Sequence, residues 1–134
     1  MTISERAARL FELDEASRGL GMQLISCDGG RAVVTMAVLG RMLNGFGTMH
    51  GGFIVCVADT AFAMACNESD DVTVAASVDI EFLRPVGAGS VLTATAERRT
   101  LAGRSGLYDV RITDESGAVV AEFRGRSRTL AARG

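Results

Sequence analysis

The sequence contains one histidine and three cysteines, too few and too scattered for the usual metal and disulfide frameworks. Zinc sites need clustered Cys and His ligands, and His50 has no such neighbours, so we expect no metal. Cys27, Cys56 and Cys66 form no CxxC pair, and their odd number argues against a secreted disulfide framework. We therefore interpret the cysteines as small core residues of a cytoplasmic protein.

Strong charge and long apolar runs are also missing. The formal net charge is -2, which gives no reason to expect nucleic acid or an anionic membrane as a partner. Charged residues interrupt the first 18 positions, so we expect no signal peptide. The apolar run 53–66 contains Asp59 and is shorter than the roughly 20 apolar residues that a membrane-spanning helix needs. The glycines at positions 45, 47, 51 and 52 lack the Lys-Ser/Thr ending of a nucleotide-binding loop.

The run 53–66 is the central feature of the chain. All its residues are apolar or small except Asp59 and Thr60, so it has no polar face to present to water. A helix of this kind is buried, and we expect the rest of the protein to surround it. At 134 residues, the chain is long enough for one domain, 1–134, built around this helix.

Two features of this helix indicate chemistry. Burial of Asp59 costs free energy and raises its pKa, so the carboxyl group needs hydrogen-bond donors or a catalytic task. The helix start, where Gly51 and Gly52 follow His50, offers free backbone N–H groups and the positive end of the helix dipole. A carboxylate and an N–H pocket are the parts of a hydrolase for activated acyl groups. The alternative is that Asp59 is a structural residue satisfied by neighbouring hydroxyl groups.

The remaining elements are predicted from local patterns. Thr2 and Glu5 fit a capping box for an amphipathic helix that continues until Gly19. A hairpin over 22–27 and 31–38 follows, and 40–49 is a glycine-rich loop. After the central helix, strands at 72–83, 91–101, 107–113 and 119–129 are expected to form a four-stranded meander. Alternation in the first of these predicts one apolar face, formed by Val72, Val74, Ala76, Val78, Ile80 and Phe82.

This order of elements predicts an α+β hotdog fold, in which a curled antiparallel sheet wraps one apolar helix. A single curled sheet leaves exposed edges and one uncovered helix flank, so we expect at least a homodimer with the site at the seam. Gly51 and Asp59 are eight residues apart, which is about 12 Å along a helix axis. If both groups act on one carbonyl carbon, they must come from different subunits related by a two-fold axis. Otherwise only one of them is functional.

The pattern Asn44-Gly45, His50-Gly51-Gly52 and Asp59-Thr60-Ala61 resembles the hotdog-fold acyl-CoA thioesterases of the 4-hydroxybenzoyl-CoA thioesterase superfamily. It is most similar to their PaaI-type branch, the phenylacetic-acid-degradation thioesterases. The resemblance covers nearly the whole chain and extends to the runs 42–45, 58–63, 65–67, 79–85, 92–96 and 123–125.

The resemblance implies roles for individual residues. The Gly51 N–H would polarise the thioester carbonyl, and Asp59 of the partner subunit would be the nucleophile or the base that activates water. His50 and Asn44 would shape the site and form hydrogen bonds near the thioester, and Thr60 would position the carboxylate or its water. These motif positions show no departure from the family pattern, whereas the run 46–49 is interpreted as a branch-specific variation that leaves the acyl preference open.

Further residues are candidates for substrate binding. Gly52 lets a bound molecule approach the backbone, and Arg84-Pro85 would lie near the pantetheine path. Arg124 and Arg126 share one face of the last strand with Arg128. Such arginines form a solvated edge or bind the phosphates of coenzyme A, and the sequence favours neither interpretation.

The first functional hypothesis is an acyl-CoA thioesterase that hydrolyses an aryl-CoA, arylacetyl-CoA or medium-chain acyl-CoA. This reaction needs no cofactor, only a polarised carbonyl and an activated oxygen nucleophile. The alternatives are a non-catalytic hotdog module that senses acyl-CoA and an enoyl-thioester hydratase. The hydratase fits poorly, because the only histidine is at the wrong spacing from Asp59 for an Asp-His pair. The resemblance favours a homotetramer built from two dimers.

Overall fold

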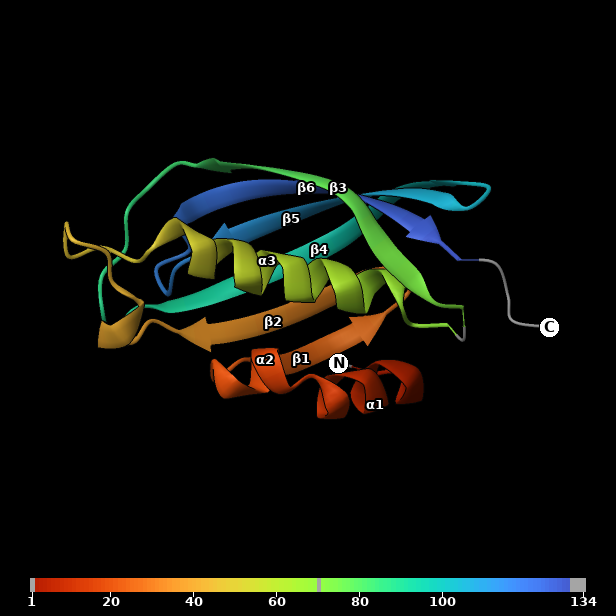
Figure 1. Ribbon diagram of the computed structural model, residues 1–134, viewed down its shortest axis with the longest axis horizontal. Coiled ribbons are helices and arrows are strands. Elements are labelled where there is room, and N and C mark those ends of the chain that lie inside the picture. Colours follow the sequence, from red (N-terminus) through yellow and green to blue (C-terminus); the bar gives the residue numbers. More distant parts are fainter. Residues whose placement is uncertain (1, 70, 131–134) are drawn as a thin grey trace.

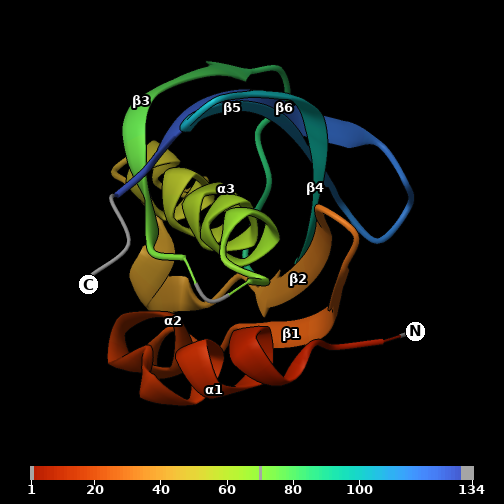
Figure 2. The same cartoon turned by 90° about the vertical axis from the view of Figure 1, so that its right-hand side faces the viewer.

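The computed structural model describes residues 2–69 and 71–130. One curled antiparallel sheet of six strands wraps the central helix α3, and two short helices pack beside β1 and α3 (Figures 1 and 2). This is the predicted hotdog architecture. The elements in chain order are α1 (Glu5–Leu13), α2 (Glu15–Gly19), β1 (Gln23–Asp28), β2 (Arg31–Ala37), a 3₁₀ turn (Gly40–Met42), α3 (Gly51–Cys66), β3 (Thr73–Phe82), β4 (Val91–Ala102), β5 (Ser105–Thr113) and β6 (Val119–Thr129).

The N-terminal helix differs from its prediction at both ends. Ser4, not Thr2, is the N-cap of α1, and its hydroxyl accepts a hydrogen bond from the Ala7 N–H. The backbone oxygen of Thr2 instead accepts a hydrogen bond from Cys27 at the sheet edge. The predicted single helix is divided at Asp14, which ends α1 and caps α2. A side chain that accepts from the backbone competes with helix continuation, which explains the break.

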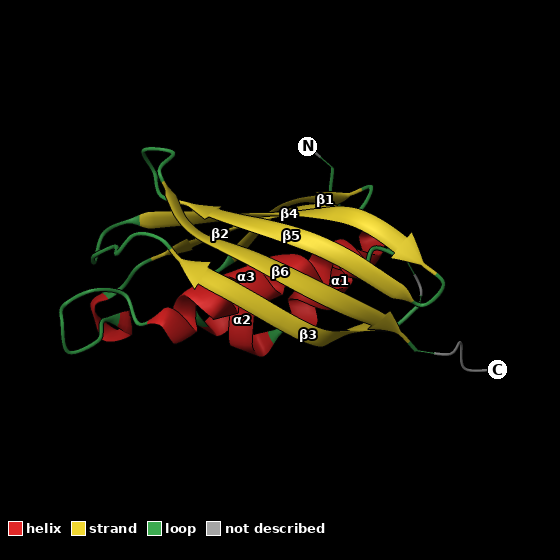
Figure 3. Ribbon diagram, turned by 90° about the horizontal axis from the view of Figure 1, so that it is seen from above, coloured by secondary structure: helices red, strands yellow, loops and turns green. Residues whose placement is uncertain are grey.

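The sheet order is β1-β2-β4-β5-β6-β3, so the predicted four-stranded meander is wrong (Figure 3). Strands β4, β5 and β6 do follow one another through tight turns. Strand β3, however, pairs with β6 at the far edge, and β4 pairs with β2. The segment 83–90 between β3 and β4 is too long for a tight hairpin turn, and it carries the chain across the sheet.

A bulge in β3 changes which side chains share a face. The register shifts between Ala75 and Ser77, so Val74 pairs with Arg128 whereas Val78 pairs with Gly125. Gly125 faces α3, since a Cβ there would lie 2.7 Å from the Phe62 ring. The predicted single apolar face is therefore wrong for Val74, which lies on the outer face of the sheet. One inserted residue reverses the alternation on either side of it.

The two edges of the sheet differ in how they are covered. The β1 edge is bridged by the N-terminal segment, where Ile3 pairs with Cys27. The β3 edge pairs with no other described strand. The inner-facing side chains of Val78 and Phe82 on this strand are 43% and 52% exposed in the single chain. The uncovered edge and its apolar side chains lie along the same side of the molecule.

Helix α3 is buried against the sheet but not on every side. Its core-facing residues include Phe62, which packs against Tyr108 and Phe123 at ring-centroid distances of 5.4 and 5.9 Å. A flank that includes Cys56 and Asp59 stays partly or fully exposed. A single chain therefore leaves the expected uncovered helix flank.

Candidate active site

The start of α3 presents one free backbone donor. His50 is the N-cap, and its Nδ1 accepts a hydrogen bond of 2.9 Å from the Gly52 N–H. Because Nδ1 is an acceptor, the neutral ring carries its proton on Nε2. The Gly51 N–H has no hydrogen-bond partner within 2–69 and 71–130. Of the two glycine amides proposed from the sequence, Gly51 is thus the one available to a ligand.

Asn44 shapes the loop that leads into this helix. Its Oδ1 accepts hydrogen bonds from the backbone N–H groups of Phe46 and Thr48, at 2.9 and 3.2 Å. The backbone N–H of Asn44 donates to the Thr48 carbonyl at 2.7 Å. These contacts fix a tight loop just before His50. Phe46 in this loop is 93% exposed.

The segment after β3 lies against the start of α3. The Met49 N–H donates to the Val86 carbonyl at 2.8 Å, which brings Arg84-Pro85 close to the helix start. A Cβ at Gly51 would lie 3.1 Å from Cζ of Phe82, so glycine fits the narrow space under this ring. Gly52 is exposed beside it.

Asp59 lies about two turns along α3, on the partly uncovered flank. Its side chain is accessible, yet burial by the surrounding protein raises its pKa, and the negative charge of Asp14 raises it further. This confirms the predicted direction. Burial and then the Asp59 charge also raise the pKa of the Cys56 thiol, which favours the unreactive protonated form. The unbroken helix keeps Gly51 and Asp59 about 12 Å apart along the axis.

The hydroxyl of Thr60 contacts helix α2. It is buried, and its Oγ1 lies 2.7 Å from Ser17 Oγ of α2. The Ser17 hydroxyl donates in turn to Asp14 Oδ2 at 2.6 Å. Sequence reasoning missed Asp14 and Ser17, although the Asp-x-x-Ser spacing is typical of a helix N-cap and could have identified Asp14.

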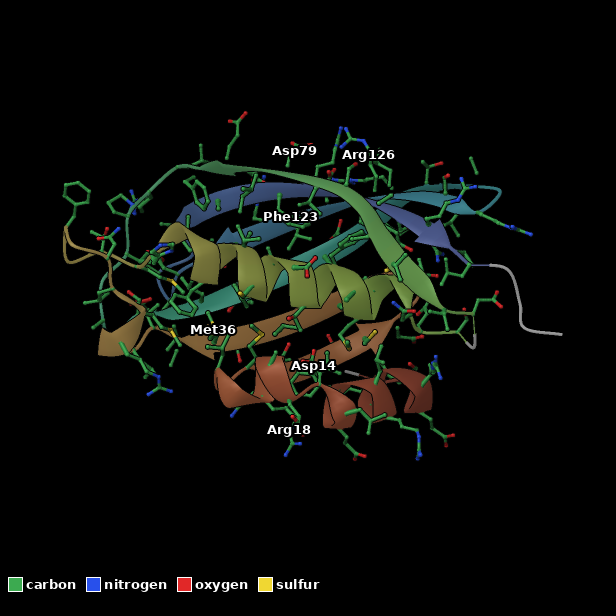
Figure 4. The ribbon with its side chains drawn as sticks, viewed as in Figure 1. Asp14, Arg18, Met36, Asp79, Phe123 and Arg126 are labelled. Atoms are coloured by element: carbon green, nitrogen blue, oxygen red, sulfur yellow. The ribbon has the colours of Figure 1, made fainter. Side chains whose placement is uncertain are left out.

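Arg124 and Arg126 lie on the outer face of the sheet, opposite α3. Arg124 forms a bidentate pair with Asp109 at 2.7 and 3.1 Å. Hydrogen bonds from Arg124, and then from Arg99, lower the pKa of Asp109. Arg126 contacts Asp79 at 3.1 Å, and Figure 4 shows both above the sheet. A hollow of about 640 Å³ on this face is lined mainly by such charged pairs. Binding of coenzyme A phosphates by these arginines stays a prediction.

No group of three or more His, Cys, Asp or Glu side chains in 2–69 and 71–130 is arranged to hold a metal ion. Within the same residues, no helix is both long and apolar enough to cross a membrane.

The free Gly51 N–H at the helix start and the Asp59 carboxylate, whose pKa is raised, both lie in a region of the chain that matches a known protein family. The thioesterase superfamily model matches residues 46–121, which contain both groups. The chain belongs to the thioesterase superfamily. As a member, it is a thioester hydrolase.

Several known proteins resemble the chain over most of its length. The acyl-coenzyme A thioesterase PaaI of Escherichia coli K12 is 44% identical over 94% of this chain and 90% of its own. The structure of E. coli PaaI has a TM-score of 0.93, covering 96% of this chain and 93% of that one. A variant of the phenylacetic acid degradation protein PaaI of Thermus thermophilus is 37% identical with a TM-score of 0.84, covering 87% of this chain and 100% of that one. The 1,4-dihydroxy-2-naphthoyl-CoA hydrolase of Listeria monocytogenes is 30% identical over 72% of this chain and 80% of its own.

Proposed function

We propose that the protein hydrolyses acyl-CoA thioesters to a free acid and CoA, and that its substrates are aryl-CoA, arylacetyl-CoA or medium-chain acyl-CoA esters. The names of the E. coli and Listeria relatives support a CoA thioester, and in the Listeria enzyme the acyl group is aromatic. The free Gly51 N–H and the Asp59 carboxylate supply what this reaction needs.

The active site is proposed to lie between two subunits. An Asp side chain is too short to bridge about 12 Å, so Gly51 and Asp59 of one chain do not meet at one carbonyl. The uncovered β3 edge and the exposed flank of α3 lie where a second copy would complete the sheet and cover the helix. This separation is the observation that carries the proposal. The assembly is at least a homodimer, and the family resemblance favours a tetramer.

The geometry supports a simple mechanism. The Gly51 N–H donates to the thioester carbonyl oxygen as negative charge develops there. Asp59 from the partner subunit either attacks the carbonyl carbon or takes a proton from the attacking water. In the first route the C–S bond breaks as an anhydride with Asp59 forms, CoA leaves as its thiolate and takes a proton from water, and a water molecule then hydrolyses the anhydride to the free acid and the Asp59 carboxylate. In the second route the water oxygen forms the new C–O bond and the C–S bond breaks. The proton then passes from the carboxylate to the CoA sulfur.

Thiol release from a panel of acyl-CoA esters tests this proposal. We expect the native protein to release CoA and Asp59→Asn to lose turnover while still binding the ester. A native protein that binds CoA esters without releasing thiol would instead be a sensing module. Hydration of an enoyl-CoA with the thioester intact would also contradict the proposal.

A further inference from the structure

A chain of hydrogen bonds connects the N-terminal helices to α3 beside Asp59. Thr60 Oγ1 lies 2.7 Å from Ser17 Oγ, and Ser17 Oγ lies 2.6 Å from Asp14 Oδ2. The residues Ser17 and Thr60 are only 4% and 8% exposed. A hydroxyl has one proton, and that of Ser17 goes to the carboxylate, so Ser17 accepts the proton of Thr60. The chain therefore runs from Thr60 to Ser17 to Asp14.

Asp14 is also fixed by a second contact. Its Oδ1 accepts a hydrogen bond of 2.9 Å from the Ser17 N–H, as the N-cap of α2. Figure 4 shows Asp14 at the junction of α1 and α2, below α3. Two short hydrogen bonds to one residue hold both oxygens of the carboxylate. Its position relative to α3 is thus set by Ser17 and Thr60.

We propose that Asp14 is a positioning residue for the hydrolysis: Ser17 and Thr60 hold its carboxylate beside α3, where its negative charge acts on Asp59. This inference rests on the proposed function. It adds two residues that lie outside the matched family region 46–121.

The charges around Asp59 agree with this role. After burial, Asp14 is the cause that raises the pKa of Asp59. A carboxylate with a higher pKa is a stronger base and takes a proton from water more readily. On α3 itself, the thiol groups of Cys56 and Cys66 interact with Asp59.

Most other charged groups on the neighbouring elements are exposed or paired, and the Nε of Arg6 is buried without a hydrogen-bond partner among the described residues. Arg18 of α2 donates to the Glu12 carbonyl at 3.0 Å. The remaining charged side chains of α1 and α2 are exposed, apart from the half-buried Arg6. The ion pairs of β3, β5 and β6 lie on the outer face of the sheet. Asp14 is therefore the carboxylate best placed to act on Asp59 among the described residues.

The test is the titration of Asp59 in variants that remove the charge but keep the fold. Asp14→Asn is suitable because Asn is as good an N-cap as Asp, so α2 keeps its cap. The matched control is Glu15→Gln, which removes an exposed carboxylate from the neighbouring position. The pKa of Asp59 is measured by NMR of the ¹³C-labelled carboxyl group, with Asp59→Asn for assignment. The acidic limb of kcat/KM is measured alongside.

We expect Asp14→Asn to lower the pKa of Asp59 and to move the acidic limb to lower pH, while Glu15→Gln moves neither. An unchanged Asp59 titration in Asp14→Asn overturns the inference. Because the NMR titration needs no turnover, a native protein without thiol release overturns the proposed function separately.

Ser17→Ala tests whether the hydrogen bonds position Asp14. Without the hydroxyl, Asp14 loses its contact toward α3, so we expect the Asp59 titration to shift in the same direction as in Asp14→Asn. The double variant then shifts no further than Asp14→Asn alone, because the two residues act as one unit. Additive shifts of the Asp59 pKa would contradict the proposal that Ser17 acts by positioning Asp14. If Ser17→Ala fails to fold, the comparison of Asp14→Asn with Glu15→Gln still decides the role of Asp14.

Discussion

Replacing Gly51 by proline removes the backbone donor that the mechanism requires. Gly51 is the first residue of α3, the one helical position where proline is favoured, because its N–H has no helical partner. His50 before it has φ -60 and ψ 130, an extended conformation that a following proline accepts. Gly51→Pro therefore deletes one N–H with little expected change in the helix.

The size of the effect follows from the role of the donor. Loss of one hydrogen bond to a developing oxyanion lowers kcat by about 10²–10³-fold, or roughly 3–4 kcal/mol. The added side chain is a separate effect, because a Cβ at this position lies 3.1 Å from Phe82 Cζ. Phe82 is half exposed and can move slightly, so we expect Gly51→Ala to lower kcat much less.

The assay compares kcat for thiol release by Gly51→Pro and Gly51→Ala on the best substrate of the panel. Circular dichroism and thermal unfolding establish that both variants remain folded. If Gly51→Pro is as active as Gly51→Ala, the Gly51 N–H does not stabilise the transition state.

Three further predictions concern stability and the role of the only histidine. Gly125→Ala forces a Cβ to within 2.7 Å of the buried Phe62 ring, so we expect a loss of about 1–3 kcal/mol in urea unfolding, whereas Gly87→Ala, with open space around it, is near neutral. The raised pKa of Asp59 means that the folded state disfavours the charged carboxylate, so stability is lost as pH rises through that pKa. Asp59→Asn should therefore raise the Tm at pH 7, and the gain should vanish below the usual Asp pKa; an equal gain at all pH values would contradict this. Because the His50 side chain caps α3, an asparagine there should keep the cap, so we expect His50→Asn to retain most of the native kcat. His50→Ala removes the cap and should lower the free energy of unfolding by about 1 kcal/mol. An equally large loss of kcat in both variants would instead indicate proton transfer by His50.

The sequence predicted those parts of the fold that depend on local patterns. The apolar run that ends at Cys66 correctly predicted α3. The turn at Gly29-Gly30 correctly predicted the first hairpin, and both glycines have positive φ. The partner of β3 could not be predicted this way, because its pairing with β6 joins distant segments. The bulge near Ala75 leaves no mark in a simple alternation of apolar and polar residues.

In the candidate site, too, local features were predicted from the sequence and long-range contacts were not. Gly51 and Asp59 lie on one helix, so their spacing alone gave their separation. The contact between Ser17 and Thr60 spans 43 residues and depends on how α2 packs against α3. The sequence pattern did not predict that the N-terminal helix is divided at Asp14, because the helical spacing of apolar residues continues close to this position.

Complementation between two inactive variants tests the two-subunit site most directly. Asp59→Asn and Gly51→Pro are each expected to be inactive as homodimers. Mixed dimers, formed by co-expression, hold one site with Gly51 from the first chain and Asp59 from the second. Random pairing then restores about one quarter of the native sites, because half of the dimers are mixed and each has one intact site. A site shared between two subunits predicts this recovery of thiol release, and mixed dimers as inactive as the two parents would contradict it.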